Sequence, residues 1–354
     1  MAFNIFNKKE HAFGLDLSGD SLKVFEFGEK GSGMAVKGFA NVLLPKGLMN
    51  GDIIADRDTF NRLLQQTLDK PQFGRLGTKK VVASLPESKS FVRVIQIPKM
   101  SDAEAENAVP FEAENFIPLP IDQVYLDWQK LGDAGDKMNI LIIASPKDFV
   151  DNFLTILEKS GLTAVALEVE SQSCHRVLVN PALGETSLIV DISSFRTSLI
   201  MVEDGNLQFT STIPIAGNSF TESIARTLGV SSSKAEMIKL KVGIANTVEY
   251  PNIKTALLPV LNNLEAEIKN ILKFHNEHSG KAVNKIILSG GSAQLANLLD
   301  FLKPEFGEIP GLSVELGNPW QNIKNMSAAP LAAGEALSYT TAIGLALRGA
   351  EFLP

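Results

Sequence analysis

Two short stretches of this 354-residue chain each place an aspartate at the end of an apolar strand, just before a turn of small polar residues. The first stretch is residues 14–26, around Asp16, and the second is residues 188–200, around Asp191. Turns of Gly and Ser let backbone N–H groups point at phosphate oxygens, and a strand-end carboxylate can hold a divalent cation directly or through water. Each Asp could instead only cap its own turn. Two copies in equivalent places favour a phosphate clamp.

A third loop, residues 287–293, follows an apolar strand and leads into a predicted helix. Its Gly290 and Gly291 would let the flat ring or the sugar of a ligand approach closely, and the helix N-terminus would add polarity. A Gly-Gly pair alone is a weak signal, because many turns contain one. Combined with the two Asp turns it indicates a nucleotide site.

The elements around these loops repeat. Hairpin signals follow both Asp turns, at residues 28–31 and 204–206, and further strands and helices follow in each half. A strand–strand–strand–helix unit that occurs twice predicts two similar α/β lobes. Apolar spacing predicts a helix that begins at Asp56 or Asp58, a long helix that ends near residues 279–280, and a third helix over 293–302.

Residues 86–160 are predicted to be an inserted α+β module within the first half of the chain. A helix is expected over 101–116, where Ser101 and Glu104 form a capping box and Pro110 should kink or divide the helix. The remaining elements are expected as strands at 90–97, 124–131 and 139–144, a helix at 146–159, and a following strand at 164–168.

On these loops the chain resembles the actin-like ATPase superfamily. Residues 16–23, 191–197 and 288–292 match its first phosphate, second phosphate and adenosine motifs. Residues 214–220 resemble the segment that opens the upper subdomain of the second lobe, and 235–239 resemble its Ala-Glu-x-x-Lys helix. The resemblance implies ATP or ADP with Mg²⁺, the metal held by Asp16 and Asp191 directly or through water. The nucleotide would be bound by Asp16, Ser18, Gly19, Asp20, Ser21, Lys23, Asp191, Ser193, Ser194, Thr197, Gly217, Asn218, Glu236, Lys239, Gly290, Gly291 and Ser292.

A closer resemblance is to the type IV pilus assembly protein PilM family. Residues 112–120, 125–128, 168–171 and 341–348 carry it, and it extends from about residue 11 to 349. The cell-division relative FtsA shares the position of the inserted module but usually ends in an amphipathic membrane helix. The chain stops at Pro354 without one, which favours PilM over an FtsA-like polymerising ATPase.

The resemblance implies an α/β, actin-like (ribonuclease H-like) two-lobed fold that contains an inserted small α+β module. Its parts would be a flexible tail at 1–10, a first lobe (1A) at 11–85, 161–185 and 330–354, an SHS2-like module (1C) at 86–160, a second lobe (2A) at 186–216 and 281–329, and an upper subdomain (2B) at 217–280.

The resemblance also implies partners. A groove between the first lobe and the inserted module would take the N-terminal cytoplasmic peptide of PilN, with further inner-membrane platform proteins and a homo-oligomer around it. The protein would be cytoplasmic and held at the inner membrane through these partners. Apolar residues crowd 111–125, and they either pack on the module's own sheet or line the groove for a basic or neutral peptide.

The chain departs from the family in both phosphate turns. Asp16-Leu-Ser and Asp191-Ile-Ser stand where the family has Asp-Ile-Gly, and bulky Phe195 and Arg196 follow the second. A Cβ at these positions crowds a bound phosphate, so we expect ATP binding with slow or absent hydrolysis. Arg196 would pair with a phosphate or point to solvent. A sugar kinase-like phosphotransferase is the remaining alternative, but the module lacks a polar sugar-binding set.

Composition excludes several other classes. The net charge is −7 at pH 7, against the basic surface that nucleic-acid binding requires. No apolar run approaches the roughly 18 residues of a membrane span. A lone Cys174 excludes an internal disulfide, and four His are too few, with one Cys, for a structural zinc site. Cys174 is expected to be buried, and His275 and His278 to lie at a solvated helix end.

Overall fold

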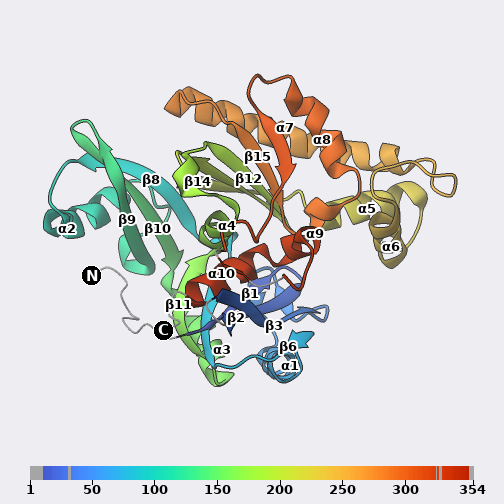
Figure 1. Ribbon diagram of the computed structural model, residues 1–354, viewed down its shortest axis with the longest axis horizontal. Helices are drawn as coiled ribbons and strands as arrows, with labels where there is room; N and C mark the ends of the chain where they lie inside the picture. Colours follow the sequence, from blue (N-terminus) through green and yellow to red (C-terminus); the bar gives the residue numbers. More distant parts are fainter. Residues whose placement is uncertain (1–10, 31–32, 324, 327–328, 351–354) are drawn as a thin grey trace.

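Two β-sheets form the frame of the residues that the structure describes. The structure is a computed structural model, and it describes residues 11–350 except 31–32, 324 and 327–328. In Figure 1 the first sheet lies in the lower half of the molecule and the second in the upper half. The flexible tail expected at residues 1–10 lies outside the described residues.

The first sheet has the strand order β11-β7-β1-β2-β3-β6. Strands β1 and β2 form the hairpin that carries Asp16, and β7 and β11 run parallel to β1. A separate pair, β4 and β5, accompanies it. The bounds are β1 Phe13–Ser18, β2 Ser21–Lys30, β3 Gly33–Leu43, β4 Met49–Asn50, β5 Ile53–Ile54, β6 Phe73–Gly74, β7 Lys80–Leu85 and β11 Thr163–Val169.

The second sheet has the order β16-β15-β12-β13-β14-β8-β10-β9. Strands β12 and β13 form the hairpin that carries Asp191, and β15 and β16 run parallel to β12. The bounds are β8 Phe91–Pro98, β9 Val124–Ala134, β10 Lys137–Pro146, β12 Ser187–Ile192, β13 Thr197–Glu203, β14 Asn206–Ile213, β15 Lys285–Ser289 and β16 Ser313–Leu316.

Five strands of each sheet follow the same plan. The order β11-β7-β1-β2-β3 in the first matches β16-β15-β12-β13-β14 in the second, and the directions also match. The repeated unit predicted from the two Asp turns is therefore confirmed. At the hairpin expected at 204–206, Asp204 and Gly205 both have positive φ angles, as a tight two-residue turn requires.

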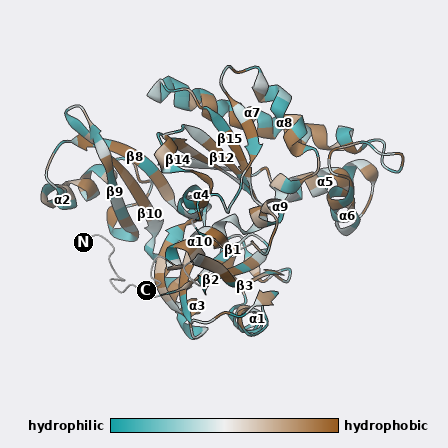
Figure 2. Ribbon diagram, viewed as in Figure 1, coloured by the Kyte–Doolittle hydropathy of each residue, from teal (hydrophilic) through white to brown (hydrophobic). Residues whose placement is uncertain are grey.

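Helices α4 (Glu170–Leu178) and α10 (Thr340–Ala350) lie between the sheets. Their side chains share one apolar core with both sheets, including Phe25 from β2 and Ile200 from β13. Cys174 of α4 is fully buried there, as expected. Figure 2 shows the apolar character of the central strands that meet this core. This shared core holds the two lobes side by side.

The other helices cover the outer faces. Helix α1 (Arg57–Asp69) begins at Asp56, whose carboxylate accepts a hydrogen bond from the amide of Thr59 at 3.0 Å, so the predicted cap is confirmed. The second sheet is covered by α5 (Gly217–Leu228), α6 (Ser232–Val242), α7 (Ile253–Ser279) and α8 (Leu298–Gly307), and α9 (Ala333–Ala336) precedes α10.

The predicted helix over 293–302 is wrong in its position. The chain makes a short 3₁₀ helix, η4 (Gly291–Gln294), and α8 begins only at Leu298. Asn297 has a φ of 67°, and this left-handed residue interrupts a continuous helix. The remaining 3₁₀ helices are η1 (Glu87–Lys89), η2 (Ile121–Gln123), η3 (Pro181–Leu183) and η5 (Leu337–Tyr339).

The inserted segment is divided between the lobes. Its strands β8, β10 and β9 pack with α2 (Asp102–Ala113) around a core of their own, while Arg93 of β8 pairs with Phe209 of β14 and so joins this sheet to the second lobe. Helix α3 (Lys147–Lys159) packs instead into the core of the first lobe. The segment therefore contacts both lobes. Its predicted boundaries, at residues 86 and 160, remain a prediction.

Helix α2 has the predicted capping box between Ser101 and Glu104. It runs unbroken through Pro110 and ends at Ala113, before the expected residue 116. The loss of one backbone hydrogen bond at Pro110 is not enough to end the helix, which continues for three more residues. The expectation that Pro110 divides the helix was therefore wrong.

Candidate functional site

A cleft of about 510 Å³ opens between the two lobes, and both Asp turns reach it. The third loop and helix α6 also contribute polar residues to its wall. Residues from both halves of the chain thus meet at one site, as the spacing of the motifs predicted. The predicted site residues that line the cleft are Asp16, Ser18, Asp20, Ser21, Lys23, Asp191, Ser193, Ser194, Glu236, Lys239, Gly290, Gly291 and Ser292.

Asp16 lies two residues before the end of strand β1 and is 2% exposed. Its carboxylate accepts hydrogen bonds from the hydroxyls of Ser18 and Ser84, at 3.1 and 3.2 Å, and lies 3.4 Å from the ammonium of Lys23. Lys23 is the residue opposite Asp16 on β2. The first turn therefore holds its carboxylate with a cation and two donors, which offset the cost of burying the charge.

Asp191 occupies the equivalent place at the end of β12, but the residue opposite it on β13 is Ser198. Burial raises the pKa of Asp191, although a hydrogen bond from Ser289 and the charge of Lys23 act against this rise. Ser289 of β15 pairs in register with Asp191, as a counterpart of Ser84 on β7. A bound cation would favour the ionised form of this carboxylate.

The two turns touch each other across the cleft. The hydroxyl of Ser194 donates to the carboxylate of Asp20 at 2.8 Å. Gly19 has a φ of 62°, and a Cβ at this position would lie 2.9 Å from the ring of Phe195. Glycine is therefore required at position 19, both by its left-handed backbone and by the ring from the opposite lobe. Phe195 remains 55% exposed.

Lys239 projects from α6 into the base of the cleft and is largely buried. Its ammonium lies 2.8 Å from Glu236 and donates to the carbonyl of Gly217 and the hydroxyl of Thr221, at 3.1 and 3.0 Å. The pair is therefore held at the cleft and is not an ordinary exposed helix pair. Gly290 has a φ of 86°, and a side chain there would press on the backbone of Ile192, so the third loop lies tight against β12.

Four predicted residues support the cleft without lining it. Gly19 forms the turn described above. The hydroxyl of Thr197 donates to the carbonyl of Ile215 at 2.5 Å. The amides of Gly217 and Asn218 donate to the carbonyls of Ser193 and Ser194, both at 2.9 Å. These bonds tie the second turn to the start of α5.

Sequence reasoning missed Glu170, which lines the cleft at the start of α4. Its carboxylate accepts a hydrogen bond from the amide of Glu87 at 3.2 Å. Burial raises the pKa of Glu170 to about 8; Asp16 and Glu87 add to the rise, and Arg196 opposes it. Glu170 lies within residues 168–171, which resembled the pilus family, but that signal assigned it no place at the cleft.

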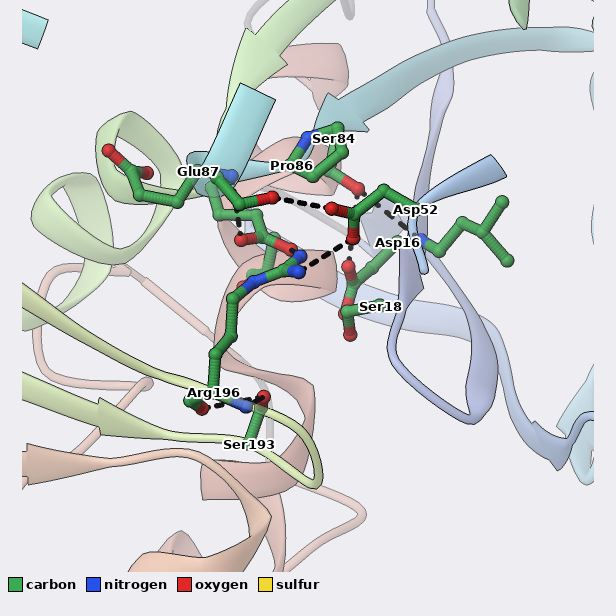
Figure 3. Close-up of polar contacts among 12 residues, drawn as sticks. Asp16, Ser18, Asp52, Ser84, Pro86, Glu87, Ser193 and Arg196 are labelled. Atoms are coloured by element: carbon green, nitrogen blue, oxygen red, sulfur yellow. Dashed lines mark hydrogen bonds and ion pairs between the residues drawn. The ribbon is translucent and has the colours of Figure 1, made fainter. Parts of the chain in front are cut away.

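The structure contradicts one of the two alternatives that the sequence allowed for Arg196. The side chain does not point to solvent, because its guanidinium crosses to the first lobe and binds the carboxylates of Asp52 and Glu170, at 2.6 and 3.5 Å. Figure 3 shows the side chain extending from the turn of Ser193 toward Asp52. Arg196 also lines the cleft, so its pairing with a phosphate stays a prediction. Asp52 lies between the short strands β4 and β5 and was not predicted as a site residue.

A divalent cation would need ligands from outside the protein. Among the described residues, no group of three or more His, Cys, Asp and Glu side chains could hold a metal ion. Mg²⁺ commonly takes one or two carboxylates and completes its shell with water and substrate phosphates. Asp16 and Asp191, both in the cleft wall, fit that arrangement.

The apolar residues of 111–125 divide into two groups. Ile117 is buried in the module's core, whereas Phe111, Phe116 and Leu119 are 72%, 40% and 38% exposed. Arg93 lies over the ring of Phe116, 5.6 Å from its centre. Strand β9, which follows these residues in the sequence, is an edge strand of the eight-stranded sheet. The exposed apolar residues are therefore near an edge strand in the sequence.

Comparisons with known proteins agree with this architecture. A sequence model of the family described as type IV pilus assembly protein PilM matches residues 14–350. A solved structure named PilM-PilN type IV pilus biogenesis complex is 27% identical, with a TM-score of 0.81, and the match covers 96% of this chain and 99% of that chain. MreB5 of Spiroplasma citri is similar in fold, with a TM-score of 0.51 at 14% identity, over 95% of this chain and 94% of that one. These neighbours confirm the expected α/β, two-lobed actin-like fold.

Cell division protein FtsA is also similar. The protein of Streptococcus pneumoniae serotype 2 (strain D39) is 23% identical over 338 residues, which cover 83% of this chain and 73% of FtsA. That of Escherichia coli (strain K12) is 27% identical over 267 residues, which cover 65% of this chain and 61% of FtsA. Within the described residues, no helix is both long enough and apolar enough to cross a membrane.

Proposed function

Because the chain belongs to the type IV pilus assembly protein PilM family, we propose that it is an ATP-binding scaffold of the pilus inner-membrane assembly platform. One observation carries the nucleotide part of this proposal: two equivalent Asp turns face the same cleft, together with a Gly-Gly loop. The protein would act at the cytoplasmic face of the membrane, where its partners hold it. ATP would bridge the lobes through its phosphates.

The cleft residues have distinct roles in this proposal. Backbone groups of the turns at Gly19 and Ser194 would hold the phosphates, and Lys23 would add a positive charge. Asp16 and Asp191 would hold Mg²⁺, directly or through water, and the metal would neutralise phosphate charge. Near Glu236 and Lys239 the ribose and base would bind, with Gly290 and Gly291 lying close to the ligand.

Isothermal titration calorimetry with ATP and Mg²⁺ tests the binding step. We expect saturable binding by the wild-type chain and at least a tenfold loss in Asp191→Ala, about 1.4 kcal/mol. Asp69→Ala, at the exposed end of α1, is the matched control and should bind as wild type does. Absence of ATP and ADP binding at millimolar ligand would refute the proposal.

Turnover should be slow or absent. Glu170 is the carboxylate of the cleft that could orient a water molecule, but it is paired with Arg196 and has a raised pKa. We expect steady-state phosphate release below about 1 s⁻¹, the low end for typical enzymes. A rate well above this, abolished by Asp16→Ala, would contradict the proposal.

The proposed partner is the cytoplasmic N-terminal peptide of PilN, since the similar solved structure is named as a PilM-PilN complex. The peptide would bind between the first lobe and the inserted module, where main-chain hydrogen bonds to a strand edge would supply affinity and exposed apolar side chains such as Phe111 and Phe116 would supply specificity. Burial raises the pKa of Asp127 on β9. The charges of Arg348 on α10 and Glu106 on α2 also act on this carboxylate, so all three residues lie near one another. The edge strand β9 thus adjoins the first lobe, and its acidic residues favour a basic or neutral peptide.

Fluorescence anisotropy with a labelled synthetic PilN N-terminal peptide tests this contact. Phe116→Ser should weaken binding at least tenfold, because an apolar side chain of the peptide would lose the ring that it packs against. Ile309→Ser is the control, since Ile309 lies in the second lobe and its exposed fraction, 40%, equals that of Phe116. Cross-linking of the peptide to the second lobe would place the contact elsewhere.

Self-assembly is the second candidate function, favoured by the similarity to FtsA. Electron microscopy and sedimentation with ATP and Mg²⁺ decide between the two. Filaments that need ATP would support an FtsA-like polymerising protein, and a monodisperse species would support the scaffold. No observation favours a sugar kinase-like phosphotransferase, because nothing in the described cleft adds a sugar-binding set.

A further inference from the structure

The contact between Arg196 and the first lobe is a feature of this chain that the proposed nucleotide site does not explain. Arg196 lies in the turn after β12, in the second lobe, and both of its carboxylate partners belong to the first lobe. The two partners are far apart in the sequence, at positions 52 and 170. A single guanidinium therefore joins two separate segments of one lobe to the other lobe.

The pairing is well shielded. The side chain of Arg196 is 14% exposed, that of Asp52 is 14% and that of Glu170 is 9%. Charged hydrogen bonds in such surroundings are stronger than surface ion pairs, because water screens them less. The carboxylates nearby raise the pKa of Arg196 still further above its already high ordinary value, so the guanidinium stays charged.

Removal of the guanidinium would leave the carboxylate of Asp52 without its counter-charge and the buried carboxyl group of Glu170 without a hydrogen-bond donor. Besides its two direct partners, Arg196 acts electrostatically on Glu87 and Asp191. Asp16 is also near this group, since its charge raises the pKa of Glu170. Without Arg196 the contact between the lobes would lose an ion pair and a charge-assisted hydrogen bond, so the closed arrangement of the lobes would lose stability.

The neighbouring turn residues add to the same contact. Ser194 bonds to Asp20, and Phe195 lies against Gly19. Ser193 keeps the turn in shape, because its hydroxyl donates to the carbonyl of Arg196 at 2.8 Å. Three consecutive residues of the second lobe, 194–196, thus contact the first lobe on the cleft side of the molecule.

We propose that Arg196, through Asp52 and Glu170, clamps the two lobes in the arrangement described here, and that this clamp needs no nucleotide. In this chain the clamp supplies the bridge between lobes that phosphates and a cation would otherwise have to supply. The clamp does not rest on nucleotide binding, and it can be tested without any nucleotide. Its failure would leave the proposed ATP site intact, and failure of ATP binding would leave the clamp intact.

Electron–electron distance measurements on spin-labelled, nucleotide-free protein test the clamp. Labels at Gln66→Cys on α1 and Ser233→Cys on α6 place one probe on an exposed position of each lobe, and the native Cys174 is buried. Wild type should give one narrow distance. Arg196→Gln should add a longer-distance population well above about one tenth of the molecules, the range of an ordinary minor state. One unchanged narrow distance in Arg196→Gln would overturn the proposal.

Three further variants make the result specific. Arg196→Lys keeps the charge and should retain most of the closed population. Asp52→Asn removes the charge of one of the two carboxylate partners of Arg196 and should shift the distance distribution as Arg196→Gln does. This variant tests the clamp if Arg196→Gln fails to fold. Lys285→Gln breaks an ion pair with Glu315 inside the second lobe and one with Glu185, which lies just before β12 and away from the Arg196 contact, and it should leave the distance unchanged. A longer distance in Lys285→Gln equal to that in Arg196→Gln would show a general loss of stability and would refute the clamp.

Discussion

The two Asp turns have the same backbone plan but hold their carboxylates differently. In the first lobe, Asp16 faces Lys23 across the hairpin and accepts from Ser18 and Ser84. In the second lobe, Asp191 faces Ser198, and burial raises its pKa. The second turn also carries two bulky residues, Phe195 and Arg196, which reach the first lobe.

The two turns therefore have different roles, one in the stability of its own lobe and the other in contacts between the lobes. The first turn is internally neutralised, so its carboxylate contributes to the stability of the lobe before any ligand binds. The second turn keeps a carboxylate without a cross-strand cation and places its own cation, Arg196, on the opposite lobe. Of the two equivalent hairpins, the first thus balances its charge within its own lobe, and the second places its charge in the contact between the lobes.

The largest expected effect comes from Asp16. Asp16→Asn should lower the free energy of unfolding by about 3 kcal/mol, because the Lys23 ammonium, 13% exposed, loses its carboxylate partner. Asp191→Asn should change it by less than about 1 kcal/mol, since a neutral amide costs less to bury than a carboxylate. Urea denaturation of the nucleotide-free variants measures both. Equal losses in the two would remove the proposed distinction between the turns.

A second, smaller effect should appear in the pH dependence of stability. The pKa of Glu170 is raised by burial to about 8 in the folded chain, against about 4.3 when unfolded. Between these values the folded state holds a proton that the unfolded state has lost, so stability is greatest at low pH and falls as pH rises toward 8.

Glu170→Gln should flatten this dependence by about 2 kcal/mol between pH 6 and pH 8. Glu87 also has a pKa raised by burial and should retain a slope of the same sign in the variant. Urea denaturation at several pH values is the measurement. A wild-type stability that rises over this pH range would show that Glu170 is ionised throughout.

The smallest expected effect, a difference of about 1 kcal/mol between two glycine variants, concerns the contact between the turns. Gly19→Ala should cost about 2 kcal/mol, from the left-handed backbone and from the ring of Phe195. Gly135→Ala has a similar φ, 66°, with open space around it, and should cost only about 1 kcal/mol. Thermal unfolding compares the two, and adding Phe195→Ala to Gly19→Ala should recover the difference. No recovery would mean that Phe195 does not press on the first turn.

Much of the fold and site could be predicted because its signals are local. Asp16, Asp191 and the Gly290 loop each lie within a few residues of the strands that position them. The caps at Asp56 and Ser101 bond to amides three residues away. Strand-end carboxylates, left-handed glycines and caps are properties of short segments, so the sequence determined the repeated hairpins and the residues that meet in the cleft.

The tertiary structure alone decided which distant segments meet. Arg196 bonds to Asp52 across 144 positions, and β8 joins β14 although more than one hundred residues separate them. Glu170 reaches the cleft only because α4 lies between the two sheets. A long side chain such as that of Arg196 takes whichever partner the packing of both lobes brings within reach. Local sequence constrains the turn that presents this side chain but carries no information about that partner.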